Sequence, residues 1–516
     1  MPEYLRAYIV VFILSNFVFW LLPKLKISFI DRSEIKQWRN YWLIVTTLCF
    51  FITNIWLYVA CLTILLGYVN HSKVDRLPLF FAISCSSPLY FFTIPGFGVI
   101  NYLITLSNIS VLVVLVLWPE ARSTKNRSVS NYPFYSAVIA YLIVISFLDA
   151  RENTVTNSLR QFVKYYIVIL LPFMALSKSV TNVDTFKKCF FALALCLTPL
   201  ALIGCFESLK YWKLYSPAFA NLLGEGSELR YGLRGDSLRA SALFSSVIAF
   251  GYMMVIGMGV LLFLQKHTNQ KNLIRFIFIL FLGALYFTKA RGPWLGLIVM
   301  IVLYIWSGPN RLGNFSKFTF GSALALLGLS LTSFGAKLIS MLPFLSSSTS
   351  HEASTVDYRF KLLEQAISLF HKNPLFGLPN YRDTPEMEVM RQGQGIIDVV
   401  NSYIDIGLSY GIVGLGLFLF IFLGLFFTVL KKLRSLPAEQ ADLINIGRSL
   451  YAILGAILFI ILTVSSVNYI PIFYWLIAGL CSAYIRLCNT VISDYKNQSN
   501  TQPHPTQAAS LLSSPP

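Results

Sequence analysis

Two positive charges stand inside an almost wholly apolar stretch of the chain. Lys289 and Arg291 lie near the middle of Phe276–Trp306, whose other residues are nearly all apolar. Charges in such a position are costly unless they face a cavity or a partner. A phosphate group would be a suitable partner, because the planar guanidinium of arginine can form two parallel hydrogen bonds with phosphate oxygens. The alternative is that both side chains only extend towards lipid head groups.

The length of this stretch indicates how it is folded. A single helix over its 31 residues would be about 46 Å long, which is more than one membrane crossing needs. Gly292-Pro293 interrupts the stretch, and this dipeptide breaks helices. We therefore predict two short helices joined by a turn, with Lys289 and Arg291 at the outer end of the hairpin.

The composition indicates an integral membrane protein. Of the 516 residues, 56% are hydrophobic and 12% are charged, so a soluble protein could not bury the apolar side chains. We predict an all-α polytopic bundle of about 12–14 spans, with a large outer loop that carries an amphipathic helix. The predicted spans are roughly 6–22, 41–69, 77–94, 101–118, 133–149, 163–177, 188–206, 241–264, 276–288, 293–307, 318–340, 402–430, 449–466 and 471–488.

The net charge of +18 is explained by basic loops that stay in the cytoplasm next to anionic lipids, so no nucleic-acid partner is expected. This rule places 207–240, 289–292 and 341–396 on the outer side. The first half of the chain leaves two alternatives open. Residues 23–40 and 70–76 are both basic, yet one predicted span separates them. Either one early apolar run does not cross, or one basic loop lies outside.

The outer segments carry further cations. Segment 207–240 contributes Arg234 and Arg239, and the large loop contributes Arg359. Around Arg359 the apolar residues recur at spacings of three and four, which predicts an amphipathic helix on or capping the bundle. Its predicted apolar face consists of Phe360, Leu363, Ile367 and Phe370. Together with Lys289 and Arg291, these cations indicate a phosphate or pyrophosphate site at the outer leaflet.

Four motifs resemble the family of O-antigen ligases and O-antigen or exopolysaccharide polymerases. TKARGPWLGL is similar to its Ser-Arg-Gly motif before an apolar span, with Lys289-Ala290 where serine is common. RASALFSSVIAFG, from Arg239, resembles an arginine that precedes a helix rich in small residues. DYRFKLLEQAISLFHKNPLFG resembles the large-loop segment, and VVNSYIDIGLSYGIVGLGLFLF resembles an Asn-x-Tyr-Leu helix that leads into a glycine-rich span. The resemblance covers roughly residues 160–466.

The resemblance implies glycosyl transfer at the outer face of the inner membrane. The donor would be an oligosaccharide on undecaprenyl pyrophosphate, and the acceptor a sugar hydroxyl on another lipid-linked unit. Arg291, Arg359 and Arg239 would stabilise the charge of the leaving pyrophosphate. Arg234 and Lys289 would also bind the donor, while Asn401 and Tyr403 would orient sugar hydroxyls. No metal or cofactor is expected. The partners would be the lipid-linked oligosaccharide, membrane lipids and a chain-length regulator or export complex.

One departure from the family pattern bears on the reaction. Val400 stands where the ligase branch has a histidine directly before the asparagine. This favours a polymerase or exopolysaccharide variant over a ligase. Asp398 is the nearest carboxylate that could act as general base, provided that the segment is extended rather than helical. Other possible bases are Asp357, Glu386, Glu388 and His371.

Three other functions are alternatives to a polymerase. Transfer of the glycan to lipid A-core would use the same donor. A membrane transporter would show internal repeats and carboxylates within the membrane, and neither is evident. A non-catalytic scaffold of an export complex is the third.

The predicted organisation comprises N-terminal transmembrane helices (1–130), a central transmembrane region with outer loop 207–240 (131–340), a large periplasmic loop (341–396), C-terminal transmembrane helices (397–490) and a disordered cytoplasmic tail (491–516).

Overall fold

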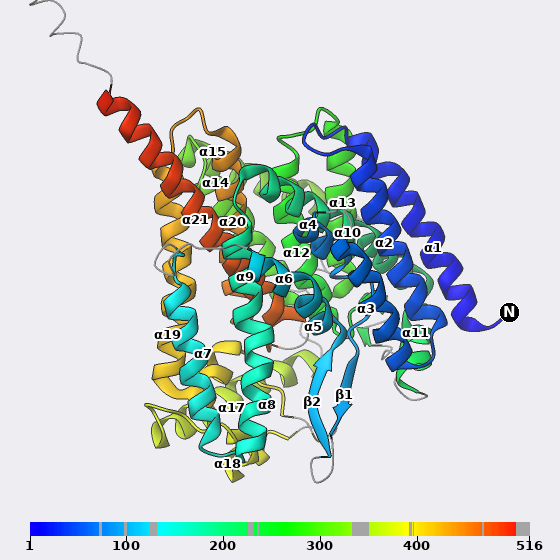
Figure 1. The fold of residues 1–516 in the computed structure, drawn as a ribbon, viewed down its shortest axis with the longest axis vertical. Coiled ribbons are helices and arrows are strands. Elements are labelled where there is room, and N and C mark those ends of the chain that lie inside the picture. Colours follow the sequence, from blue (N-terminus) through cyan, green and yellow to red (C-terminus); the bar gives the residue numbers. More distant parts are fainter. Residues whose placement is uncertain are drawn as a thin grey trace, which may run out of the picture.

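The computed structural model describes residues 1–71, 75–96, 101–123, 132–224, 232–234, 237–332, 350–391, 395, 397–466 and 469–501. It confirms an all-α polytopic bundle (Figure 1). In the described part of the chain, eight helical segments are long and apolar enough to cross a membrane. They are α1 with η1 (Glu3–Leu21, Leu22–Leu25), α8–η4–α9 (Val155–Tyr165, Tyr166–Leu170, Leu171–Ser179), α10 (Val183–Lys210), α12 (Val247–Leu264), α13 (Lys271–Thr288), α19 (Ser402–Ser435), α20 (Ala441–Ile461) and α21 (Tyr469–Thr501).

Shorter elements complete the bundle and its ends. Three of them are apolar helices, namely α3 (Ile55–His71), α7 (Tyr135–Ala150) and α14 (Arg291–Trp306). The others are α2 (Arg32–Phe51), α4 (Arg76–Ile83), β1 (Phe91–Pro95), β2 (Tyr102–Ser107), α5 (Asn108–Leu112), η2 (Val113–Leu117), α6 (Trp118–Ser123), α11 (Ser216–Leu223), β3 (Leu233–Arg234), β4 (Ser237–Leu238), α15 (Arg311–Ser330), α17 (Ser350–Lys372), η5 (Tyr381–Asp383) and α18 (Pro385–Glu388).

The bundle has two chemically distinct ends. At one end, which we call the basic end, Lys188 Nζ lies 2.6 Å from Glu34 Oε1 and 3.0 Å from Asp75 Oδ2, and His267 Nε2 lies 3.0 Å from Asp442 Oδ1. At the other, the loop end, β2 contacts α8, and α17 packs against α19 and α18 (Figure 1). The positive-inside rule predicts that the basic end faces the cytoplasm.

For the first half of the chain, the structure supports the first alternative: the apolar run 41–69 does not cross the bundle as a single span. The predicted span 41–69 is interrupted at Ile52–Asn54, where the Asn54 side chain accepts hydrogen bonds from Trp56 N at 2.9 Å and Leu57 N at 3.2 Å and so caps α3. Helices α2 and α3 therefore run away from the basic end and back again. Since Lys188 contacts both Glu34 and Asp75, the two basic segments lie at the same end of the bundle.

Residues 77–94 and 101–118 were predicted to be membrane-spanning helices, and this prediction was wrong. The chain forms the short helix α4, the antiparallel hairpin β1–β2, and then α5, η2 and α6. Arg76 and Glu120 lie 3.8 Å apart, so this excursion also starts and finishes at the basic end. The sequence of such an apolar run does not distinguish a strand from a membrane helix, because both have the same apolar composition.

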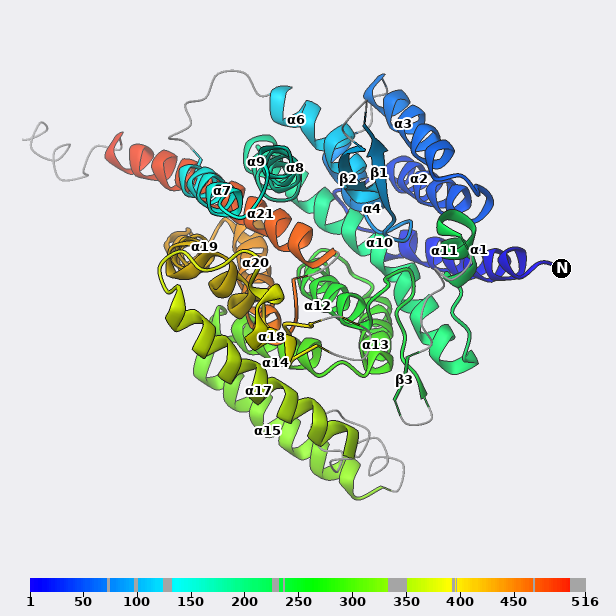
Figure 2. The ribbon, with the colours of Figure 1, turned by 90° about the horizontal axis from the view of Figure 1, so that it is seen from below.

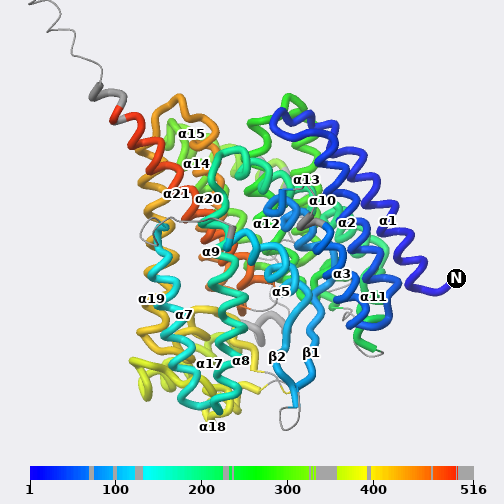
Figure 3. The backbone as a smooth tube through the Cα atoms, viewed as in Figure 1, coloured from blue at the N-terminus to red at the C-terminus, as the bar shows by residue number. Residues whose placement is uncertain are grey.

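Two further predictions need correction near the C-terminal half. The predicted span 318–340 falls partly on α15, which is not among the eight apolar segments of the described chain; residues 333–349 lie outside it. The predicted disordered tail is wrong for 491–501, because α21 continues to Thr501 (Figure 3). The polar residues after Asp494 can extend α21, because each residue added to a helix that is already formed gains one backbone hydrogen bond. Residues 502–516 lie outside the described chain.

Candidate functional site

The turn between α13 and α14 forms the centre of the site. Two helices meet here as predicted, but the break falls at Lys289 and Ala290 rather than at Gly292-Pro293. Lys289 adopts a left-handed conformation (φ 52°) that ends α13, and its ammonium lies 3.9 Å from the centre of the Tyr286 ring. Pro293 lies in the first turn of α14, where its missing N–H is not needed. The break therefore comes from the left-handed cap, and α14 begins at Arg291.

The Arg291-Gly292 pair has a packing explanation. A Cβ atom on Gly292 would lie 2.4 Å from the Thr463 Oγ1 atom, at the end of α20. Glycine thus lets the start of α14 approach α20 closely. Arg291, one residue earlier, is half-buried beside this contact.

The loop that carries β3 and β4 closes over this turn. Arg234 Nη1 donates to Lys289 O at 2.8 Å, and Arg239 Nε donates to Thr288 O at 3.0 Å. The two guanidiniums therefore cap carbonyls at the end of α13, which a helix leaves without partners of its own. Burial, and then the neighbouring Arg234 charge, lower the pKa of Arg239 to about 10. Two adjacent, partly buried cations favour binding of an anion.

A buried ion pair beneath the turn holds this loop. Glu207 is 0% exposed and accepts hydrogen bonds from Leu214 N at 3.0 Å and Ala242 N at 2.9 Å. Lys213 Nζ lies 3.7 Å from Glu207 and donates to Arg239 O at 2.6 Å. Glu207 therefore positions the backbone of Arg239. The sequence analysis missed this residue, although a glutamate at the end of an apolar span is a signal of function.

The large loop brings Arg359 and Asp398 to Arg291. The pKa of Arg359, on α17, is lowered by burial and by the Arg291 charge, while the Asp398 carboxylate opposes the shift. Arg291 and Asp398 therefore both lie within electrostatic reach of Arg359. Asp398 Oδ1 accepts a hydrogen bond from Ser465 Oγ at 2.6 Å, which fixes the exposed carboxylate.

The segment before α19 is not helical, which matters for the proposed base. Ile397 and Val399 are buried, Asp398 is exposed and Val400 is half-buried, an alternation typical of extended backbone. Asp398 and Val400 therefore lie on the same side of the segment. In this conformation, the Asp398 carboxylate can reach nearly the same region as a side chain at position 400.

Asn401 and Tyr403 have structural contacts of their own. Asn401 caps α19, because its side-chain oxygen accepts from Tyr403 N at 2.9 Å and from Ile404 N at 3.2 Å. The Tyr403 hydroxyl donates to Leu458 O at 2.8 Å, which ties α19 to α20. Their predicted contacts with sugar hydroxyls stay a prediction.

The alternative bases have other partners or positions. Glu388 pairs with Arg391 at 2.6 Å, Glu386 contacts Lys372, and His371 Nδ1 lies 2.9 Å from Ile367 O. The nearby cation that the sequence analysis missed is Arg382. Its Nη2 atom lies 2.6 Å from Asp405 Oδ1. Burial opposes the charge of Arg382, but Asp405 outweighs it and raises the pKa.

The amphipathic helix of the large loop exists, but its predicted face was wrong. Helix α17 buries Leu362, Ala366 and Leu369 in a small second core with Tyr381 and Met387. Three of the four residues of the predicted stripe face outward instead: the exposed fractions are 68% for Phe360, 42% for Leu363 and 49% for Ile367. The fourth, Phe370, packs against the second core as predicted. Both stripes follow helical spacing, and the second core decides which of them packs against the protein.

The Pro-Leu-Phe-Gly turn fixes this loop to the bundle. Helix α19 is broken at Gly411 (φ 65°), and Ile412 N donates to Pro374 O at 2.8 Å across the break. Leu378 N donates to Leu408 O at 2.7 Å. A Cβ atom on Gly411 would lie 2.3 Å from Leu375 O, and one on Gly377 would lie 2.5 Å from Gly411 N. Both glycines are therefore required for this close contact of two backbones.

Comparison with known protein families identifies the region that surrounds the turn. Residues 276–419 match the family model described as O-antigen ligase. This part of the chain is similar to the O-antigen ligase/polymerase family. The matched region runs from α13 to the first part of α19, so it includes Lys289, Arg291, Arg359 and Asp398. Arg234, Arg239 and Glu207 lie outside it. A search of the curated proteins found no match.

Proposed function

We propose that this protein is a polysaccharide polymerase. It joins undecaprenyl-pyrophosphate-linked oligosaccharide units at the outer face of the inner membrane. The observation that carries the proposal is the convergence of five cations on one turn at the loop end. We call them the turn cluster: Arg234, Arg239, Lys289, Arg291 and Arg359. The similarity of residues 276–419 to the O-antigen ligase family supports glycosyl transfer, and the cluster supports a donor with a pyrophosphate leaving group.

In the proposed reaction, the acceptor hydroxyl attacks the sugar carbon that bears the pyrophosphate. The carbon–oxygen bond to pyrophosphate breaks as the new glycosidic bond forms. Arg291 and Arg359 stabilise the charge that develops on the leaving group. Asp398 takes the proton from the acceptor hydroxyl. The scheme requires neither a nucleotide sugar nor a metal.

Val400 favours polymerisation over transfer to lipid A-core. The ligase branch has a histidine at this position, and here Asp398 lies on the same side of an extended segment. A carboxylate so placed gives the polymerase a base without that histidine. Transfer to lipid A-core remains the second candidate, since it uses the same donor and the same cations.

The test is the glycan chain-length profile of a deletion strain that carries the wild-type protein or Arg291→Ala. Both the surface polysaccharide and the lipid-linked intermediates are measured. Arg291→Ala should lower the yield of long chains by about 100-fold, because one charge-stabilising donor is lost. The matched control is Arg391→Ala, which removes a loop-end arginine that pairs with Glu388 on the surface.

Each outcome of this experiment has a defined meaning. Loss of long chains, with single repeat units still reaching their final acceptor, supports the polymerase. Full-length chains stranded on the lipid carrier would mean a ligase instead. An unchanged profile for Arg291→Ala would mean that the turn cluster only anchors the turn.

A further inference from the structure

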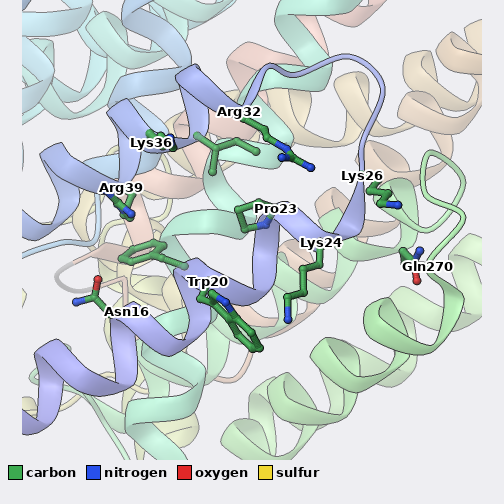
Figure 4. A pocket seen from close by; sticks show the side chains of 11 residues that line it. Asn16, Trp20, Pro23, Lys24, Lys26, Arg32, Lys36, Arg39 and Gln270 are labelled. Carbon is green, nitrogen blue, oxygen red and sulfur yellow. The ribbon is translucent and has the colours of Figure 1, made fainter.

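A second group of cations lines a pocket at the basic end. The pocket lies between the end of α1, the start of α2 and the loop before α13, and has a volume of about 820 Å³ (Figure 4). We call it the basic pocket and name its cations: Lys24, Lys26, Arg32, Lys36 and Arg39. It is far from the turn cluster, since the two lie at opposite ends of the bundle.

The charges of the basic pocket are not balanced by the protein. Its lining contains no aspartate or glutamate. Among the described residues, no carboxylate lies within ion-pair distance of any of the five cations. The nearby acidic side chains serve other groups: Asp31 and Glu34 cap α2, and Glu34 also pairs with Lys188 at 2.6 Å. By contrast, Lys187 and His267 at the same end both pair with Asp442.

The pocket also has an apolar side that opens towards the membrane. Trp20 lines it and is 61% exposed, and the Lys24 ammonium lies 3.0 Å from the centre of the Trp20 ring. Along α1, exposed Ile13 and Phe17 precede Trp20 at helical spacing. Helix α1 lies at the periphery of the bundle (Figure 2). A molecule in the pocket could thus extend an apolar chain along α1.

We propose that the basic pocket binds the head group of an anionic phospholipid. The phosphate would lie among the five cations, and the acyl chains would follow Trp20, Phe17 and Ile13 into the membrane. Basic pockets between helices on the cytoplasmic side suit such head groups. The volume exceeds that of a single phosphate ion, and the apolar track would be unused by a free anion. A lipid accounts for both features.

The test measures thermal unfolding of the full-length protein in a non-ionic detergent. The added probes are phosphatidylglycerol, cardiolipin, phosphatidylcholine and inorganic pyrophosphate. The pocket variant is Lys24→Gln/Arg32→Gln/Lys36→Gln. The matched control is Lys431→Gln/Lys432→Gln/Arg434→Gln, which removes the same charge from the basic end of α19. Each cation near an anionic head group contributes about fivefold in affinity, so the pocket variant should bind anionic lipid about 100-fold more weakly.

The outcomes separate a lipid site from its alternatives. The two anionic lipids should raise the unfolding temperature of the wild type and of the control variant, and phosphatidylcholine should not. An equal loss in pocket and control variants would overturn the proposal in favour of diffuse surface attraction. Equal stabilisation by pyrophosphate that is lost in the pocket variant would overturn the lipid assignment and leave an anion site, whereas pyrophosphate bound at the turn cluster should stabilise both variants equally. If the triple variant does not fold, bound lipids are counted by native mass spectrometry on Arg32→Gln and Lys36→Gln, and unchanged counts would also overturn it.

Discussion

The turn cluster and the basic pocket each hold five cations, but they are built differently. In the turn cluster, four of the five are arginines, and two of these donate to backbone carbonyls at 2.8 and 3.0 Å. In the basic pocket, three of the five are lysines, and most of the side chains are exposed. The turn cluster is thus suited to a ligand with a defined geometry, and the basic pocket to one that is held mainly by charge.

The supporting structure differs in the same way. Beneath the turn cluster, the buried Glu207–Lys213 pair holds the backbone of Arg239, and Ser465 fixes Asp398. Around the basic pocket, Lys24 lies on η1 and Lys26 directly after it, and the other three cations lie on α2 (Figure 4). Preorganised donors stabilise a developing charge without reorganisation at the moment of reaction. A lipid head group needs no such precision, because attraction to several exposed cations suffices.

Replacing arginine by lysine should have a large effect at the turn cluster and almost none at the basic pocket, and this is the largest difference expected between the two sites. Arg239→Lys and Arg291→Lys should each lower the rate of polymer formation by about 100-fold, because lysine cannot form bidentate contacts with phosphate. Arg32→Lys and Arg39→Lys should change the affinity for anionic lipid by less than about twofold, since the charge is kept. The two measurements are in vitro polymerisation and lipid-dependent thermal unfolding. If lysine replaced arginine without loss at both sites, the turn cluster would not depend on the geometry of arginine.

The glycines that attach the large loop should affect stability first and activity only as a consequence. Gly411→Ala should destabilise the protein by about 3 kcal/mol, because alanine is strained at φ 65° and its Cβ would meet Leu375 O. Activity should fall with it, since α17 carries Arg359, whereas lipid binding at the basic pocket should persist. The control is Gly416→Ala in the same helix, where a Cβ meets no atom within 4 Å. Denaturant unfolding in detergent measures both, and an equal response of the two variants would show that the close contact does not matter.

Much of the turn cluster could be predicted from the sequence. Charges inside an apolar run are expensive wherever they occur, so Lys289 and Arg291 indicated a site without any knowledge of the fold. Family motifs then connected Arg239 and Arg359 to the same site. The sequence alone does not determine whether the backbone at Asp398 is extended, and the alternating burial of 397–400 shows that it is.

Other features depend on contacts between distant segments. The break at Gly411 follows from its contact with Gly377, which periodicity within α19 does not reveal. The packed face of α17 was predicted wrongly because two apolar stripes compete, and a core formed with Tyr381 and Met387 decides between them. The break at Ile52–Asn54 did carry a local signal, since asparagine is a common first cap of a helix.

The smallest effect concerns the ion pair beneath the turn cluster. Glu207→Gln leaves Lys213 without its counter-charge and should cost about 2 kcal/mol. Burial already lowers the pKa of Lys213, while Glu207 opposes this shift. Without Glu207 the pKa falls further, so the unfolded chain binds more protons than the folded protein at neutral to alkaline pH. The variant should therefore gain stability more steeply than the wild type as the pH rises from about 7 to 10.

The measurement is the unfolding temperature of Glu207→Gln as a function of pH, with Glu388→Gln as the control. Glu388 pairs with Arg391 on the surface, so its variant should follow the wild-type curve. If Glu207 acts only through Arg239, polymer formation in Glu207→Gln should fall about tenfold while lipid binding at the basic pocket is unchanged. Parallel pH curves for both variants would mean that Lys213 is paired by its contacts with Arg239 O and Ser241 alone. The rigidity of the turn cluster would then come from the loop backbone rather than from the buried charge.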